Sequence, residues 1–599
     1  MAETENEVKR PIRIANFSGM IGDYFEALHN AVHGEPVDVL VGDYLAELTM
    51  GRISENYLDA GRPEAIQDYY VSFFLKQIST ELEEIQNRGL KVVTNAGAFA
   101  PEAMAQVIRD MIAERGLTLR VAHITGDNIL PRVSELAAQG QMQNMDSGET
   151  LGNGAARFVA ANAYLGGWGI AAALEGGADI VICGRVTDAS LAVGPAAWWH
   201  GWETHEWDKL AGACAAGHII ECGPQAMGGN FSGFTDIGTE KRLGFPIAEI
   251  DWKGDTVITK RATESGRVTI NTVKAQLNYE IQGPEYINPD VVLHVDTIQL
   301  SEAGPDRIKM SGTKGSPAPE TTKANCFYHN GFRTMMLAYI TGRDGGQKTE
   351  WLRGQMQEIA DKFPLDDYRF DPMGQVPEDP KSQREATMPI RIAIAAQDKR
   401  TIKSFMADFG GLWLGSLPGF HGENAAKVTS RAEFWPGLVL QSELTHHAVF
   451  EGGQHIKAAV PPTKAFIRTP PPKSGDWDAK DYGPTKPVPF GDVVHARSGD
   501  KGANANLGVW THNPEAADWL SGFLTTETFT SLIEVSGDIT VERYPMNNIG
   551  GVYFVLKNYF GTSGTSNIGL DQIGKGLGEF LRSRIVDVPV QFLNQPAIN

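Results

Sequence analysis

The sequence is poor in cysteine, and its few cysteines follow no known pairing. Among 599 residues only Cys183, Cys214, Cys222 and Cys326 carry a thiol, and no two of them form a CxxC or zinc-binding spacing. Scattered thiols in so long a chain are typical of a reducing compartment. We therefore expect reduced cysteines in a cytoplasmic protein, without disulfides or a metal site.

Long apolar segments and an excess of basic residues are also missing. No uninterrupted apolar run approaches the roughly 20 residues of a membrane helix, and the first residues, MAETENEVKRPIRIANF, have no apolar core of the signal-peptide type. The chain has 53 Lys and Arg against 73 Asp and Glu, a net charge of −20. Such a chain offers no broad positive surface for nucleic acid or anionic lipid. We expect neither as a partner, although a local basic pocket for a phosphate or carboxylate is compatible with this charge.

Glycine, by contrast, is abundant, with 66 residues, and predicts many tight turns and close approaches of the backbone. The length predicts more than one domain, and the pattern predicts the α/β class. We expect a mostly parallel sheet in residues 1–240, a second β-rich and α/β part in 241–460, a proline-rich linker in 461–489 and a C-terminal α+β domain in 490–599.

In the first part, short apolar runs alternate with helical patterns. The predicted strands are 12–17, 37–41, 90–94, 117–124 and 179–183, and the predicted helices are 24–32, 63–86, 101–115, 129–139 and 155–175. Short β pieces, one of them at 268–270, are expected in the second part. Nearly continuous apolar strands are typical of a parallel sheet that is buried on both faces. Ligands of such sheets bind beyond the carboxyl ends of the strands.

Polar residues gather at these predicted strand ends. The candidates are Asn95, His123, Asp127, Asn128, Arg185 and Asp188. Arg185 is the most specific of them, because its guanidinium is a fork for a carboxylate or a phosphate. The alternative for each Asp or Asn is a cap on the following helix. With the polar segments 19–23 and 42–43, five polar strand ends lie along one edge of the predicted sheet and favour a binding site.

Two further segments combine glycine with polar side chains. In GHIIECGPQAMGGNFSG (217–233), His218 and Glu221 could act as general acid and base beside Gln225. A core histidine is the alternative for His218, and an inert buried thiol is favoured over a nucleophile for Cys222.

In HARSGDKGAN (495–504), Ser498, Asp500 and Lys501 could bind an anion, with Asn547 lining the same cleft. The alternative is a solvated hairpin, because SGDKG is good turn chemistry.

Several long segments resemble the acyclic terpene utilisation (AtuA-like) family. They are ANAYLGGWGIAAALEGGADIVICGRVTDASLAVGP (161–195), GHIIECGPQAMGGNFSG (217–233) and SRAEFWPGLV (430–439). VVHARSGDKGANANLGVW (493–510) and the segment 548–589 resemble the C-terminal ferredoxin-fold-like domain of that family. The resemblance covers nearly the whole chain. It implies a cytosolic protein in the breakdown of branched, terpenoid acyl chains, usually handled as CoA thioesters.

Residues and resemblance together predict an enzyme of hydratase or lyase type that acts on a branched acid or its acyl-CoA ester. The predicted proton-transfer residues are His123, Asp127, Asp188, His218 and Glu221. The predicted substrate-binding residues are Asn95, Asn128, Arg185, Gln225, Ser498, Asp500, Lys501 and Asn547. No dinucleotide fingerprint is present, so we expect no cofactor beyond the CoA of a thioester substrate.

Two alternatives stay open. One is a non-catalytic binding or scaffold subunit of an acyl-CoA complex, and the other is a hydrolase or tailoring enzyme of secondary metabolism. We expect a homo-oligomer in each case.

Overall fold

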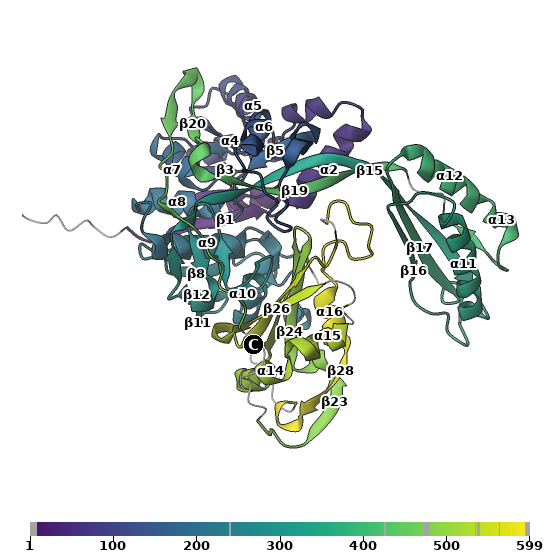
Figure 1. The fold of residues 1–599 in the computed structure, drawn as a ribbon. Helices are drawn as coiled ribbons and strands as arrows, with labels where there is room; N and C mark the ends of the chain where they lie inside the picture. Colours follow the sequence, from purple (N-terminus) through teal and green to yellow (C-terminus); the bar gives the residue numbers. More distant parts are fainter. Residues whose placement is uncertain are drawn as a thin grey trace, which may run out of the picture.

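The computed structural model describes residues 9–238, 241–423, 427–472, 480–533, 535, 539–561 and 564–593. They form a large body, a subdomain that projects from it and a C-terminal domain packed against it (Figure 1). Within these ranges, no helix combines the length and the apolar character needed to span a membrane.

The body is built on a mixed sheet, which among the described residues has eleven strands in the order β11-β12-β8-β7-β1-β2-β3-β6-β4-β20-β21. Its central strands run parallel: β1 (Ile12–Ser18), β2 (Val39–Gly42), β3 (Lys91–Thr94), β6 (Ile180–Ile182) and β4 (Val121–Thr125). Antiparallel strands extend both edges: β7 (Pro246–Ile250), β8 (Thr256–Lys260), β12 (Arg307–Ser311), β11 (Gln299–Gly304), β20 (His447–Val449) and β21 (His455–Lys457). Parallel pairing in this sheet is thus confined to strands from the first 240 residues.

The central strands are buried on both faces, which explains their continuous apolar runs. Along β1, Ile12 and Ile14 belong to one hydrophobic core, whereas Ala15 and Phe17 belong to another. The first core is shared with α7 (Trp168–Glu175), α8 (Ser190–His200) and α9 (Trp207–Ile220). The second is shared with α1 (Ala27–His33), α2 (Glu47–Asp59), α3 (Ser72–Ile78), α4 (Leu82–Arg88) and α5 (Pro101–Glu114). The side chains alternate because successive residues of a strand point to opposite faces.

Two local predictions are wrong. The helix expected over 155–175 is replaced in its first half by β5 (Phe158–Ala163), which pairs with a distant partner, β15 (Thr321–Thr341). The strand expected at 268–270 is the start of α10 (Ile270–Leu277), where Thr269 forms a capping box with Thr272. In the first place strand pairing with β15 decides the structure, and in the second the capping hydrogen bonds of Thr269 and Thr272 decide it. The local apolar pattern indicates neither.

The long strands β15 and β19 (Thr429–Leu440) run from the body into the projecting subdomain (Figure 1). There β15 also pairs with β17 (Thr387–Ala396), which is flanked by β16 (Asp367–Pro372). The helices α11 (Gly345–Ala360) and α12 (Lys399–Gly410) share a separate core with these strands. The body end of β15 carries Lys323, which becomes part of the site described below.

The C-terminal domain has an antiparallel sheet in the order β24 (Val494–Lys501), β25 (Asn504–Thr511), β27 (Gly551–Lys557) and β26 (Thr540–Met546). Its helices are α14 (Ala517–Phe523), α15 (Thr526–Ile533) and α16 (Leu577–Ser583), and β23 (Thr485–Pro489) pairs with β28 (Ile585–Pro589).

Direct hydrogen bonds attach this domain to the body. Tyr553 donates to the carbonyl of Ile281 over 2.5 Å, and Trp510 Nε1 donates to Asn271 over 3.1 Å. At the tip of the β24–β25 hairpin, Asn504 Nδ2 donates to Asp146 Oδ1 of the body over 3.1 Å.

Candidate functional site

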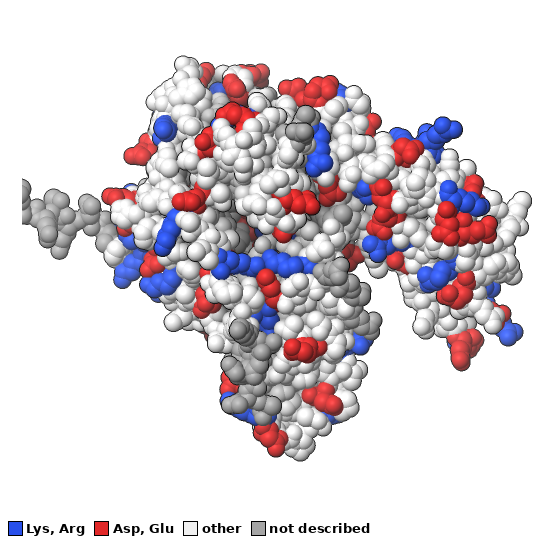
Figure 2. Space-filling model, viewed as in Figure 1, with Lys and Arg blue, Asp and Glu red and all other residues white. Residues whose placement is uncertain are grey.

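A cavity of about 1270 Å³ lies where the body, the strands β15 and β19 and the C-terminal hairpin meet. Its lining includes Tyr164, Asp188, Glu280, Tyr286, Lys323 and Lys501. Figure 2 shows Lys and Arg side chains in a band where the C-terminal domain meets the body. The hairpin that the sequence predicted as an anion-binding loop therefore shares one cavity with the strand end that carries Asp188.

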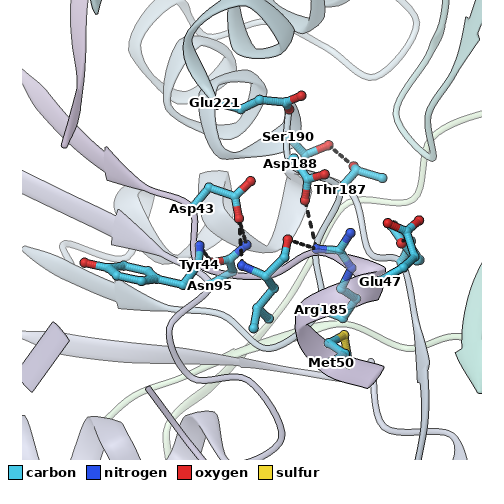
Figure 3. Close-up of polar contacts among 12 residues, drawn as sticks. Asp43, Tyr44, Glu47, Met50, Asn95, Arg185, Thr187, Asp188, Ser190 and Glu221 are labelled. Carbon is cyan, nitrogen blue, oxygen red and sulfur yellow. Dashed lines mark hydrogen bonds and ion pairs between the residues drawn. The ribbon is translucent and has the colours of Figure 1, made fainter. Parts of the chain in front are cut away.

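Three carboxyl groups form a cluster at one side of this cavity. Asp43 follows β2, Asp188 follows β6, and Glu221 follows α9 (Figure 3). One carboxyl oxygen of each lies within 4.8 Å of the others. Asp43 and Glu221 are each 5 % exposed. We call Asp43, Asp188 and Glu221 the carboxyl cluster.

Burial is the main reason that the pKa values of Asp43 and Glu221 lie well above the usual range of carboxyl groups. The negative charge of Asp188 raises both further, and Glu280 adds to the effect at Glu221. Arg185 acts in the opposite direction on both groups. Asp43 and Glu221 therefore keep their protons at a higher pH than ordinary carboxyl groups do.

Arg185 and Asn95 fix the orientation of the cluster. Arg185 Nη1 donates to Asp188 Oδ1 over 2.8 Å and to the carbonyl of Leu45 over 3.0 Å. Asn95 Nδ2 donates to Asp43 Oδ1 over 2.6 Å, while its own Oδ1 accepts from the backbone N–H of Tyr44. Both side chains are buried, so the predicted binding residues Arg185 and Asn95 hold other site residues in place.

An ionised group lies beside the cluster. Glu47, at the start of α2, accepts a hydrogen bond from Tyr164 Oη over 2.7 Å and a contact from Lys323 Nζ. Burial would raise the pKa of Glu47, but the charges of Lys323, Lys501 and Arg185 outweigh it and hold the pKa well below its usual range. Burial lowers the pKa of Lys501, yet Glu47 and Glu280 raise it overall. An ammonium group is thus stabilised inside the cavity.

His218 lies behind Glu221 rather than in the open cavity. Its imidazole is 0 % exposed, packs 4.7 Å from the ring of Tyr286 and has Nδ1 at 3.3 Å from Glu221 Oε1. Burial, aided by the charge of Lys501, lowers the pKa of His218 to about 4. The ring is therefore neutral at neutral pH.

Other predicted proton-transfer residues lie elsewhere. Asp127 Oδ2 accepts from the backbone N–H of Arg185 and from Asn162 Nδ2, each over 2.9 Å, and so anchors the loop that carries Arg185. Burial raises the pKa of Asp127. His123 is buried on β4, where Arg109 is its strongest charged neighbour. Asn128 is exposed and bonds to Gln67.

The remaining predicted binding residues divide between the domain interface and the surface. Gln225 contacts Arg497 across the interface, and Ser498 Oγ accepts from the backbone N–H of Gly578 inside the C-terminal domain. Asn547 is exposed. Burial, with the charge of Glu280, raises the pKa of Asp500 to about 8.

Cys222 is a poor candidate for a nucleophile. Burial raises the pKa of its thiol well above the usual range, as does the charge of Glu221. All four cysteines are unpaired.

Sequence reasoning missed several residues of the site as candidates. They are Asp43, Glu47, Tyr164, Glu280, Tyr286 and Lys323. Asp43 had a usable signal, because it directly follows an apolar strand run. Lys323 had none, since it reaches the cavity only through the pairing of β15 with β5.

Two protein-family models match the chain. The model of the acyclic terpene utilisation family protein AtuA matches residues 12–450, and that of the AtuA ferredoxin-like domain matches residues 488–587. The chain belongs to the AtuA family. The carboxyl cluster of this AtuA protein lies in the first match, and Lys501 lies in the second. No curated protein matches the chain.

Proposed function

We propose that this AtuA protein is an enzyme that acts on a branched or terpenoid carboxylic acid, or on its CoA ester, by proton transfer of the hydratase or lyase type. The observation that carries the proposal is the single cavity in which Asp188 of the carboxyl cluster lies with Lys323 and Lys501. Proton transfer at the carbon next to a carbonyl needs an acid–base group, and a nearby cation stabilises the negative charge that develops on the carbonyl oxygen.

The cavity lining suits an amphipathic substrate. Tyr286, Pro319, Phe434 and Trp435 provide apolar surface for a branched hydrocarbon chain. Lys501 and Lys323 provide positive charge for a carboxylate or for a carbonyl oxygen that gains negative charge during the reaction. The family's link to acyclic terpenes supports a substrate of this kind.

In the elimination direction, a proton leaves the carbon next to the carbonyl, and the hydroxyl group on the following carbon takes up a proton and leaves as water. Hydration is the reverse, so no oxidant or reductant is consumed. We assign both proton transfers to the carboxyl cluster, with Asp188 facing the substrate. Asn95 and Arg185 position the cluster, and Asp127 positions Arg185.

Turnover of a panel of branched enoyl-CoA and hydroxyacyl-CoA thioesters and of the free acids tests the proposal, followed by the ultraviolet absorbance of the conjugated product. We expect one class to react and Asp188→Asn to lower kcat at least 100-fold. Asp367→Asn, on strand β16 of the projecting subdomain, serves as a control that keeps full activity. No turnover of any panel member, together with no rise in melting temperature on adding them, would reject the proposal.

The same preparation addresses the other expectations. A scaffold subunit predicts stable co-purification with an acyl-CoA enzyme and no response to the panel. Light scattering after size-exclusion chromatography tests the predicted homo-oligomer, for which the expected mass is a multiple of 65.1 kDa.

A further inference from the structure

Hydrogen bonds hold Asp43 and Asp188 each through one oxygen, and one oxygen of Glu221 lies near a histidine. Asp43 Oδ1 accepts from Asn95 Nδ2 and from the backbone N–H of Leu45, and Asp188 Oδ1 accepts from Arg185 Nη1. Glu221 Oε1 faces His218 Nδ1. In the described part of the chain, no hydrogen bond is formed by the second oxygen of any of the three. Supports that fix one oxygen and leave the other available are typical of the surroundings of metal ligands.

Two unpartnered groups at the cluster point to a ligand. Glu221 Oε2 is fully buried and has no hydrogen-bond partner among the described residues. The imidazole of His218, also fully buried, has Nδ1 directed at Glu221, and neither of its ring nitrogens is satisfied within those residues. Buried polar atoms without partners are rare in proteins. A cation between the three carboxylates would give Glu221 Oε2 the partner that it lacks.

We propose that Asp43, Asp188 and Glu221 bind one divalent cation of the Mg²⁺ or Mn²⁺ class, with His218 as the positioning partner of Glu221. An all-carboxylate set favours a hard cation over a soft one. Ligand oxygens lie about 2.0–2.1 Å from such a cation, so small movements suffice to bring oxygens within 4.8 Å of one another onto one ion.

Binding of a cation at the carboxyl cluster does not depend on the proposed function, but the catalytic role of that cation rests on it. At this place a cation would hold the carbonyl or carboxylate oxygen of the substrate and supply a bound water as the proton-transferring group. Asp43, Asp188 and Glu221 would then act as ligands, and the acid–base step would require the loaded cluster.

A second group in the chain supplies a matched control. His29 and His33 of α1 both contact Glu81, at 3.1 and 2.9 Å, and could also hold a metal ion. Their imidazoles are largely exposed, so His33→Gln removes this group with little effect on the fold.

The experiment titrates Mn²⁺ into the EDTA-treated full chain and follows free Mn²⁺ by electron paramagnetic resonance. We expect one ion bound per chain, at least tenfold weaker binding in Asp43→Asn, Asp188→Asn and Glu221→Gln, and unchanged binding in His33→Gln. Asp188→Asn decides the matter if Asp43→Asn fails to fold, as judged by circular dichroism, because Asp188 lines the cavity.

Three results would overturn the inference: no bound Mn²⁺ at millimolar concentration, binding that the cluster variants leave unchanged, or binding that His33→Gln abolishes. If the protein turns over its substrate without bound Mn²⁺, the proposed function stands and the role of a cation in the reaction is rejected. If Mn²⁺ binds tightly at the carboxyl cluster but no thioester or acid is turned over, the cation site stands and the proposed function is rejected.

Discussion

The buried guanidinium of Arg185 donates a hydrogen bond from Nη1 to Asp188 Oδ1 over 2.8 Å, although the arginine side chain is only 1 % exposed. The same nitrogen donates to the carbonyl of Leu45, and the guanidinium lies 4.1 Å from the centre of the Tyr164 ring. Arg185 thus connects the strand end of β6 to the loop after β2. Asp188 and Asp43 are held near each other by this connection.

Replacing Arg185 by lysine is expected to damage both stability and turnover. Lysine keeps the charge but loses the planar guanidinium, which donates to Asp188 and Leu45 and lies over the Tyr164 ring. We expect a loss of about 2 kcal/mol in the free energy of unfolding, measured by urea denaturation, and at least a tenfold lower kcat. The exposed Arg369→Lys should change neither, and equal effects in the two variants would contradict the role of Arg185.

Lys501→Met tests whether the C-terminal hairpin contributes to substrate binding. The variant removes the cation that the C-terminal domain places in the cavity near Glu47. We expect KM for an anionic substrate to rise at least tenfold, because a charge-assisted contact is lost, while kcat changes less. Lys309→Met, on β12 next to the edge strand β11, is the matched control. An unchanged KM would show that the hairpin does not touch the substrate.

The burial of His123 leads us to predict that the protein loses stability in mild acid. Burial lowers its pKa to about 4, against about 6.5 for an exposed histidine, so below pH 6.5 the unfolded chain binds a proton that the folded chain does not. Stability is therefore lost as the pH falls from about 6.5 toward 4. His123→Gln should make the free energy of unfolding about 1 to 2 kcal/mol less sensitive to a change from pH 7 to pH 5. Parallel pH profiles for the two proteins would contradict this.

Replacing glycine by alanine is expected to have opposite effects on stability at two positions. A Cβ at Gly499 of β24 would lie 2.6 Å from Cε2 of Tyr279, whose ring is enclosed between the domains, so Gly499→Ala should destabilise by about 1–3 kcal/mol. A Cβ at the exposed Gly354 of α11 meets no atom within 4 Å, and Gly354→Ala should stabilise by about 0.5–1 kcal/mol. Thermal melts of both variants give the two signs, and a stabilised Gly499→Ala would contradict the close packing of the domains.

Local patterns predicted much of the body and of the C-terminal domain. The strands β1, β2, β3, β4 and β6 lie close to the predicted apolar runs, because burial on both faces leaves a continuous hydrophobic signal. The same reasoning failed at β5, whose alanine-rich sequence favours a helix until β15 pairs with it. Pairing between segments about 160 residues apart leaves no trace in either segment alone.

The sequence by itself determined the α/β character of the chain, the family and the polar strand ends that hold Arg185 and Asp188. Only the tertiary structure decided which polar residues meet. It placed Asp127 and Asn95 in support of others, moved His123 to a different environment, and joined Asp43, Glu221 and Lys501 from three distant segments. The physical reason is that periodicity and turn chemistry act within a few residues, whereas the cavity and its charges arise from packing between elements.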